Sequence, residues 1–277
     1  MPVMKVSFIE PYIELKPYIQ SIWIVESPVG MSPSENNLAA PNGSPKLIFN
    51  FENSIVSVVD GKLQQSKEHC LYFVGTRDSA ALLRTASGKT YCIGIEFYPH
   101  GAYPIFGIPM VEMTNCLFPA DTIFSGYTRE LCDVLPDLRS AKRAINLIQN
   151  QLAAMLKKRR LQNPIVEYCV GNLKANNGLI GISDLERKTG YSRRYLEMLF
   201  KDHVGFSPKV LAGIFRFQKF YRKWALGLPY DKIKDELYSY YYDQAHFAKE
   251  FRKLTGFSPQ YFTRHISNEF GRRLAAH

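Results

Sequence analysis

An internal repeat near the C-terminal end is the feature that most restricts how this chain can fold. Residues 200–208 (FKDHVGFSP) recur 51 residues later as residues 251–259 (FRKLTGFSP). Extending the register backward pairs Ser192 with Asp243, and both residue types are favourable helix N-caps. Each copy is therefore predicted to be a helix of about ten residues that begins at a cap and ends at glycine. In each copy, Ser-Pro then starts another helix.

The segment before the first copy completes a helix-turn-helix unit. Ser183 and Glu186 have the spacing of a capping box, so a helix is expected to begin there and to include residues 185–189. Gly190 then allows a tight turn before Ser192 caps the next helix. The second helix of such a unit can insert into the major groove, where Arg pairs with guanine and Glu accepts from cytosine.

The residues expected to contact DNA are the caps and polar-face residues of the two repeated helices. They are Ser192, Arg193, Arg194, Glu197, Lys201, Asp243, Gln244, His246 and Lys249. For His246 a structural role is an equal alternative, because it pairs with Tyr195 in the repeat, a position expected to be half-buried. The clustered tyrosines before the second copy are expected to pack in the core rather than to stack on bases.

Charge is distributed unevenly along the chain. Residues 1–154 carry 12 Lys and Arg against 14 Asp and Glu, whereas residues 155–277 carry 23 against 11. Such an excess of positive charge predicts a polyanionic partner, either nucleic acid or an anionic membrane surface. No run reaches the roughly 18 apolar residues of a membrane span, and the N-terminus lacks a signal peptide's apolar segment. We therefore expect a cytoplasmic protein that binds double-stranded DNA and no membrane.

No motif for catalysis, metal binding or cofactor binding occurs in the sequence. The five cysteines are odd in number and form no C-x-x-C pair, which argues against a disulfide framework and a zinc site. His69 and His100 are isolated, and no nucleophile elbow, P-loop or dinucleotide glycine motif occurs. We expect no enzyme, no metal and no cofactor. A β-domain enzyme fused to a DNA-binding module is the alternative from another class.

The first part of the chain is rich in short β-type runs separated by turn signals. Strands are expected at residues 21–25, 47–51, 55–59, 71–74 and 91–97. From residue 120 the apolar period becomes helical, and Ile145, Ile148, Leu152 and Leu156 recur on one face of a helix over residues 140–160. This apolar stripe either docks on its own chain or forms a dimer seam.

The expected fold class is α+β, in three parts. Residues 1–118 form a β-rich, cupin-like barrel or sandwich, and residues 119–162 form a helical connector. Residues 163–277 form an all-α domain with two helix-turn-helix units joined by a long helix. Aromatic candidates for an effector pocket are Trp23, Phe49, Phe51 and Tyr91, for each of which plain core packing is the alternative.

Residues 182–263 resemble the DNA-binding region of the AraC/XylS family, in which two helix-turn-helix units are joined by a long helix. The matching residues are Ile182, Leu185, Ser192, Tyr195, Leu196, Phe200, Lys201, residues 205–208 (GFSP), Arg216, Ala225, residues 242–247 (YDQAHF), Phe251 and residues 255–261 (TGFSPQY). The resemblance implies a sequence-specific transcription regulator with a sensing or dimerising N-terminal domain. Such regulators are commonly activators, which would add RNA polymerase to the partners.

Residues 1–118 also resemble the β-rich sensor domain found in one branch of that family. The residues that carry this resemblance are Pro17, Tyr18, Trp23, residues 47–50 (LIFN), residues 73–75 (FVG), residues 97–103 (FYPHGAY), Phe106 and Gly107. An effector-independent architectural DNA-binding protein, whose N-terminal domain only assembles dimers, is the alternative function.

The second unit departs from the family pattern. Tyr240 or Tyr241 stands where the family has glycine before the turn, and a bulky residue adopts a positive φ only at a cost. Either the second turn is wider than the first, or the second unit binds DNA mainly through phosphates.

Overall fold

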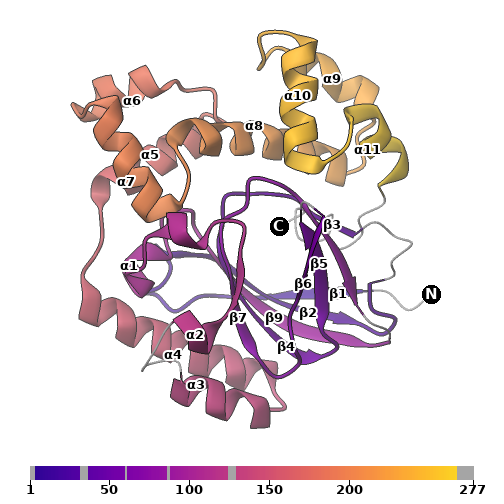
Figure 1. The fold of residues 1–277 in the computed structure, drawn as a ribbon, viewed down its shortest axis with the longest axis vertical. Helices are drawn as coiled ribbons and strands as arrows, with labels where there is room; N and C mark the ends of the chain where they lie inside the picture. The colour runs from indigo at the N-terminus through magenta and orange to yellow at the C-terminus, as the bar shows by residue number, and fades with distance from the viewer. Residues whose placement is uncertain (1–3, 32–36, 60, 86–87, 124–128, 267–277) are drawn as a thin grey trace.

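The computed structural model describes residues 4–31, 37–59, 61–85, 88–123 and 129–266. Two packed sheets fill the lower part of Figure 1, with helices beneath and beside them and the C-terminal helices above. Within the described ranges, no helix combines the length and apolar character needed to cross a membrane.

The N-terminal region is a sandwich of two antiparallel sheets. The larger sheet has the order β1 (Lys5–Ile9), β2 (Ile19–Ser27), β9 (Thr90–Phe97), β4 (Lys46–Glu52), β7 (Leu71–Val74) and β10 (Leu117–Pro119). The smaller sheet has the order β3 (Asn37–Ala39), β8 (Ala81–Thr85), β5 (Ile55–Val59) and β6 (Lys62–Gln65). All five predicted strand segments lie in these strands, so the predicted sandwich is confirmed.

One face of the larger sheet is covered by helices. These are α1 (Tyr103–Phe106), the 3-10 helix η2 (Met110–Met113), α2 (Ala120–Ile123), α3 (Arg129–Val134), the 3-10 helix η3 (Leu135–Asp137) and α4 (Ala141–Arg159). The apolar stripe of α4 (Ile145, Ile148, Leu152 and Leu156) is buried in the same core as this sheet face. The stripe therefore docks on its own chain, and the segment expected to be a connector completes the core of the N-terminal domain.

The C-terminal region contains two helix-turn-helix units on a shared helix. The helices are α5 (Pro164–Ala175), α6 (Ile182–Thr189), α7 (Arg193–Val204), α8 (Pro208–Ala225), α9 (Tyr230–Tyr238), α10 (Gln244–Thr255) and α11 (Pro259–His265). Leu211 and Phe215 of α8 belong to the core of the first unit, whereas Phe217 and Phe220 belong to the core of the second. Helix α8 thus joins the units as one shared structural element (Figure 1).

The repeat folds as its residues predict. Ser192 accepts a hydrogen bond from the Tyr195 N–H at the start of α7, and Asp243 accepts one from the His246 N–H at the start of α10. The repeated glycines end these helices in the left-handed region, with φ of +91° and +80°. Such values favour glycine because a Cβ atom is disfavoured there.

The start of α6 differs from the prediction. The helix begins at Ile182, so Ser183 lies inside it, and the carboxylate of Asp184 accepts from the Gly181 N–H at 3.3 Å. Glu186, expected to complete a capping box, instead accepts from the N–H of Arg193 at 2.6 Å. The predicted capping box is therefore wrong, because Glu186 stabilises the start of the following helix.

Candidate nucleic-acid interface and interdomain cavity

Helix α7 presents a polar face to solvent. Arg194 and Lys201 are exposed, and the part of the chain that the structure describes offers neither side chain an ion pair or hydrogen bond. Arg193 forms an ion pair with Glu197, with 2.9 Å between Nε and Oε1. The Ser192 hydroxyl caps the helix. Of the predicted contact residues on this helix, Arg194 and Lys201 are therefore the ones free to bind a phosphate or a base.

Helix α10 has a corresponding face. Gln244 and Lys249 are exposed, with no side-chain partner within the described ranges, whereas Asp243 serves as the cap. The ring of His246 is exposed, with Nε2 3.9 Å from Glu250 Oε2. The repeat pairs Lys201 with Arg252, which is also exposed. Arg252 was absent from the predicted set, although the 51-residue register would have identified it.

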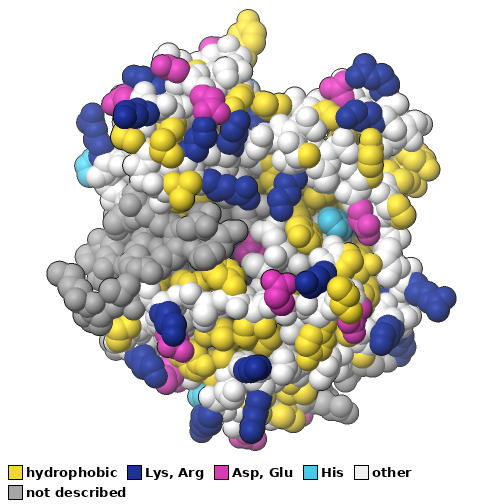
Figure 2. Space-filling view, turned by 180° about the vertical axis from the view of Figure 1, so that it is seen from behind, with side chains coloured by type: hydrophobic (Ala, Val, Ile, Leu, Met, Phe, Trp, Pro, Cys, Tyr) yellow, Lys and Arg dark blue, Asp and Glu magenta, His cyan; other side chains and the backbone are white. Residues whose placement is uncertain are grey.

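Helix α8 lies between the two faces. Helix α8 has 18 residues, which at 1.5 Å per residue spans about 27 Å. This length is comparable with the roughly 34 Å between successive major-groove segments on one side of a duplex. The two units sit at opposite ends of α8 in Figure 1, and Lys and Arg side chains lie over this helical region in the upper half of Figure 2.

The turns inside the two units differ. Three residues separate α6 from α7, and Gly190 among them has φ of +75°. Five residues separate α9 from α10, and none of them has a positive φ. Tyr241 packs its ring 5.1 Å from that of Phe247 instead of forming a glycine-type turn. Of the two alternatives, the structure shows the wider second turn, in which two extra residues replace the left-handed glycine.

Arg216 of α8 connects the two units. Its guanidinium donates to the carbonyl of Gly178, before α6, at 2.8 Å and to both carboxylate oxygens of Glu250 on α10 at 3.1 and 3.3 Å. It also lies over the ring of Tyr241, 5.4 Å from the centroid. Both ionic side chains are less than one-fifth exposed. One side chain of the shared helix thus fixes the turn before the first unit and the recognition helix of the second.

A cavity of about 740 Å³ lies between the two sheets and reaches α8. The side chain of Trp23 forms part of its wall and lies flat over Gly94, where a Cβ atom would fall 2.1 Å from the ring. Apolar residues of both sheets (Ile48, Ile55 and Leu83) contribute to the wall, and Phe215 and Tyr221 of α8 line it from the C-terminal domain.

Three of the four predicted pocket residues lie elsewhere. These three, Phe49, Phe51 and Tyr91, project from the helix-covered face of the larger sheet. The ring centroid of Phe51 lies 4.8 Å from that of Phe49 and 4.7 Å from that of Tyr91. Of the four, Trp23 alone lines the cavity. Side chains alternate between the two faces of a strand, and Lys46 and Ile48 of β4 face the cavity whereas Phe49 does not. The alternation of β4 places Ile48 and Lys46 together on the face opposite Phe49.

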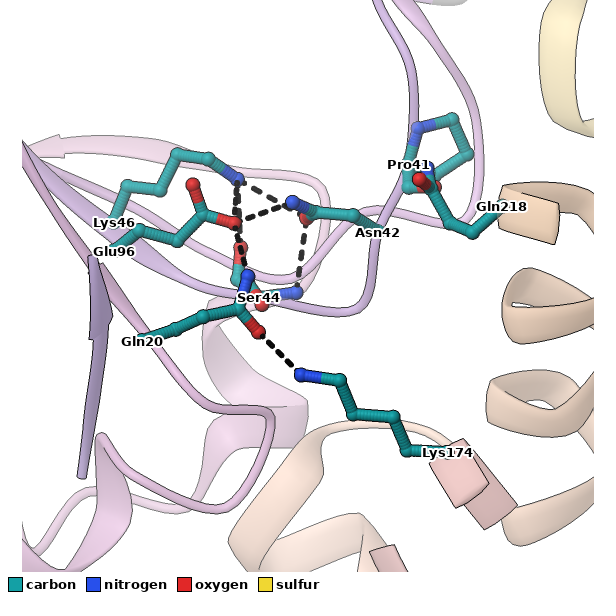
Figure 3. Close-up of polar contacts among 8 residues, drawn as sticks. All are labelled: Gln20, Pro41, Asn42, Ser44, Lys46, Glu96, Lys174 and Gln218. Atoms are coloured by element: carbon teal, nitrogen blue, oxygen red, sulfur yellow. Dashed lines mark hydrogen bonds and ion pairs between the residues drawn. The ribbon is translucent and has the colours of Figure 1, made fainter. Parts of the chain in front are cut away.

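A polar network closes one end of the cavity (Figure 3). The Lys46 ammonium donates to Asn42 Oδ1 at 3.2 Å and to the Ser44 carbonyl at 3.0 Å, and it lies 3.9 Å from Glu96 Oε1. Glu96 also accepts from Asn42 at 2.5 Å and from Gln20 at 3.3 Å. Burial lowers the pKa of Lys46 from its ordinary value, and the neighbouring carboxylate of Glu96 opposes this shift.

The same network reaches the C-terminal domain. Lys174 of α5 donates to Gln20 at 3.1 Å, and Gln218 of α8 donates to the carbonyl of Pro41 at 2.7 Å. Figure 3 shows both side chains extending from the helices toward the sandwich. Residues 41–44 therefore contact the cavity network on one side and α8 on the other.

Both recognition helices also contact the N-terminal domain directly. The ring of His203 on α7 lies 4.1 Å from that of Tyr103, and the Val204 carbonyl accepts from Thr76 at 3.1 Å. Lys253 on α10 lies 3.4 Å from Asp78. Burial lowers the pKa of His203. Among the described residues, no cluster of three or more His, Cys, Asp or Glu side chains is arranged to hold a metal ion.

Comparison with known proteins gives two similarities at the level of sequence. Residues 7–119 match a family described as a domain of unknown function, DUF6597. A stretch of 112 residues is 32% identical to the F1 operon positive regulatory protein of Yersinia pestis. This stretch covers 39% of the present chain and 35% of the relative, so the chain spans about a third of the length of the curated relative that it matches.

Solved structures give more distant similarities. ToxT from Vibrio cholerae aligns over 96% of this chain and 98% of its own, with 8% identity and a TM-score of 0.45. The Cupin_2 domain of an XRE family transcriptional regulator from Enterobacter cloacae aligns over 35% of this chain and 97% of its own. Its identity is 15% and its TM-score 0.27.

Proposed function

We propose that this chain, which is similar to the AraC/XylS family of regulators over residues 182–263, is a sequence-specific DNA-binding transcription regulator controlled by a small molecule in the interdomain cavity. The observation that carries the proposal is the pair of capped recognition helices on one shared helix, each with exposed polar side chains free of intramolecular partners. The similarity to a positive regulatory protein of Yersinia pestis supports an activator.

DNA binding would use α7 as the principal recognition helix. Arg194 and Lys201 are seven residues apart, two helical turns, and therefore project from the same side of α7. Arg is the residue type that most often contacts guanine specifically, and Lys readily binds phosphate. On α10 the exposed Gln244 would offer adenine recognition, while Lys249 and Arg252 would bind the backbone.

Control by a ligand would act through the segment that touches both the cavity and α8. Gln218 holds the Pro41 carbonyl, and the neighbouring Asn42 belongs to the cavity network. A ligand that rearranges Asn42 would change how α8 sits on the sandwich, and with it the position of both recognition helices. Ligand and DNA binding would then be coupled, each altering the affinity for the other.

Selection of binding sites from random duplexes tests the DNA-binding proposal. We expect a defined motif, and we expect Arg194→Ala to weaken binding to it by about 1–3 kcal/mol and to relax preference at one base position. Lys62→Ala, on an exposed strand of the smaller sheet, is the matched control and should bind as the unaltered protein does. Selection without a motif, and equal salt dependence for every sequence, would instead support the architectural function.

We also propose two protein partners, a second copy of this chain and RNA polymerase. The apolar stripe of α4 is buried within its own chain, so a homodimer would need another surface. Light scattering of the full chain, with and without its selected duplex, gives the stoichiometry. Transcription from a template that carries the selected site, with purified polymerase, distinguishes activation from repression.

A further inference from the structure

We infer that Met198, on the solvent-facing side of α7, contacts the 5-methyl group of a thymine in the major groove, close to the base that Arg194 contacts. The inference rests on the proposed function and deepens it, because it assigns part of the sequence preference to an apolar side chain. The first unit would then recognise a site that contains a thymine at a fixed distance from a guanine.

Three large apolar side chains are exposed at the start of α7. Tyr191 is 41% exposed, Tyr195 36% and Met198 51%. They are spaced four and three residues apart, so they lie along one side of the helix and of the turn before it. The rings of Tyr191 and Tyr195 stack with their centroids 5.0 Å apart. Apolar side chains that gather on a surface mark an interaction site more often than single ones do.

Met198 lies near the centre of the face that α7 turns away from its core. The buried residues of this helix are Leu196, Leu199, Phe200, His203 and Val204. Successive residues of an α-helix are rotated by about 100°, so the direction opposite to this buried set falls between Arg194 and Met198. Both side chains are exposed. They therefore project toward whatever α7 binds.

The neighbouring polar side chains leave few residues to contact bases. Arg193 and Glu197 form an ion pair with each other, which occupies the carboxylate that could accept from cytosine. Recognition helices contact base edges mainly with their N-terminal residues. Arg194 and Met198 lie in the N-terminal half of α7, whereas Lys201 lies in the C-terminal half. Base contacts at the centre of this face would therefore come from one arginine and one methionine.

The chemistry of the major groove identifies the group that suits Met198. Among the four standard bases, thymine alone presents a methyl group there, and apolar side chains contact it. Methionine is unbranched and polarisable, so it can adapt its shape to such a group. Arg194 and Lys201 on the same side of α7 would attract the phosphate backbone. An apolar protein surface would instead take these two charges out of water without a partner.

The repeat provides an internal contrast. Its 51-residue register pairs Met198 with Lys249 and Tyr195 with His246. Lys249 and His246 are exposed on α10, as Met198 and Tyr195 are on α7. The same position is therefore apolar in the first unit and cationic in the second. A methyl contact is expected from Met198, whereas Lys249 is expected to bind phosphate.

Single replacements of thymine by deoxyuridine test the inference, because each removes one methyl group and leaves base pairing intact. Every thymine of the selected site is replaced in turn, and binding of the full chain is measured by fluorescence anisotropy at fixed salt. We expect one replacement to weaken binding about fourfold, the effect of one buried methyl group. Arg194 and Met198 are four residues apart, about 6 Å along the helix. The sensitive thymine should therefore lie within about two base pairs of the position at which Arg194→Ala relaxes preference.

A substitution assigns the methyl contact to Met198. Met198→Ala should bind the thymine and deoxyuridine duplexes equally, because the side chain that distinguishes them is gone. Lys249→Ala, at the matching position of the second copy, should weaken binding to both duplexes and keep the fourfold ratio. Circular dichroism of both variants checks the fold.

Three results would overturn the inference. They are a selected site in which no thymine methyl group matters, a fourfold ratio that persists in Met198→Ala, and a Met198→Ala protein that binds DNA normally but no longer activates transcription. The third would assign Met198 to a protein partner. In each case a defined motif would still support sequence-specific binding, whereas selection without any motif would reject the proposed function together with the inference.

Discussion

The two helix-turn-helix units contain the same capped helix, yet they are held together by different means. In the first unit the turn is short, and Gly190 provides the left-handed conformation that it requires. In the second unit the turn has two more residues and no left-handed residue, and its tyrosines pack on the helices. The first turn is thus determined locally, whereas the second depends on tertiary contacts.

The contacts that orient each unit also differ. The first recognition helix ends against the N-terminal domain, where His203 packs on Tyr103 of α1. In the second copy the repeat places Leu254 at the position of His203, and this residue lies in the core of its own unit. The second recognition helix is held by the mostly buried pair of Glu250 and Arg216, and its more exposed Lys253 lies 3.4 Å from Asp78 of the N-terminal domain. A repeated sequence therefore gives two similar helices with different dependence on the rest of the molecule.

Replacing Arg216 should have the largest effect on the stability of the chain. In Arg216→Met the Glu250 carboxylate loses its ionic partner in a site that is mostly buried, and we expect unfolding of the chain to become easier by about 2–4 kcal/mol. Urea unfolding followed by circular dichroism measures this loss. Arg222→Met, on the exposed side of the same helix, is the control. Equal losses in the two variants would mean that the second unit does not depend on this ion pair.

Changing the glycine of the first turn should have a smaller effect. Gly190→Ala introduces a Cβ atom at φ of +75°, which should cost about 1–2 kcal/mol of folding free energy. Tyr240→Gly in the second turn should give no compensating gain, because no residue there needs a positive φ. The same urea titrations compare both variants. A stabilised Tyr240→Gly protein would show that the second turn is strained after all.

Lowering the pH should destabilise the first unit, and this effect on stability should be the smallest of the three. Burial lowers the pKa of His203, so the unfolded chain takes up a proton at higher pH than the folded chain does. Its contribution to stability is complete above about pH 6.5 and decreases as the pH falls below that value. His100 behaves in the same direction, because burial lowers its pKa to about 4.

Replacing His203 with the residue of the second copy isolates this effect. In His203→Leu the decrease in melting temperature between pH 7.5 and pH 5 should be smaller than in the unaltered chain, as measured by calorimetry. His265→Leu, an exposed histidine of α11, should retain the full decrease. An unchanged decrease in His203→Leu would assign the pH dependence to other groups.

Local features of the molecule were predictable from its residues. The caps Ser192 and Asp243, the terminal glycines and the five strand segments follow from interactions between residues close in sequence. Double helix-turn-helix architecture follows from the repeat, since both copies carry the same start and stop signals. Even the wider second turn was foreseeable, because tyrosine stands where glycine would be needed.

The cavity and the connections between domains depended on tertiary structure. Alternation along β4 separates Phe49 from Lys46, but it does not tell which face will meet helices and which the second sheet. The capping role of Glu186 likewise required knowledge of where the next helix begins. The sequence by itself determined two recognition helices and a β-rich domain, because their signals are local. Only the packing of distant segments decided that a mostly apolar cavity with Lys46 at one end would lie against α8.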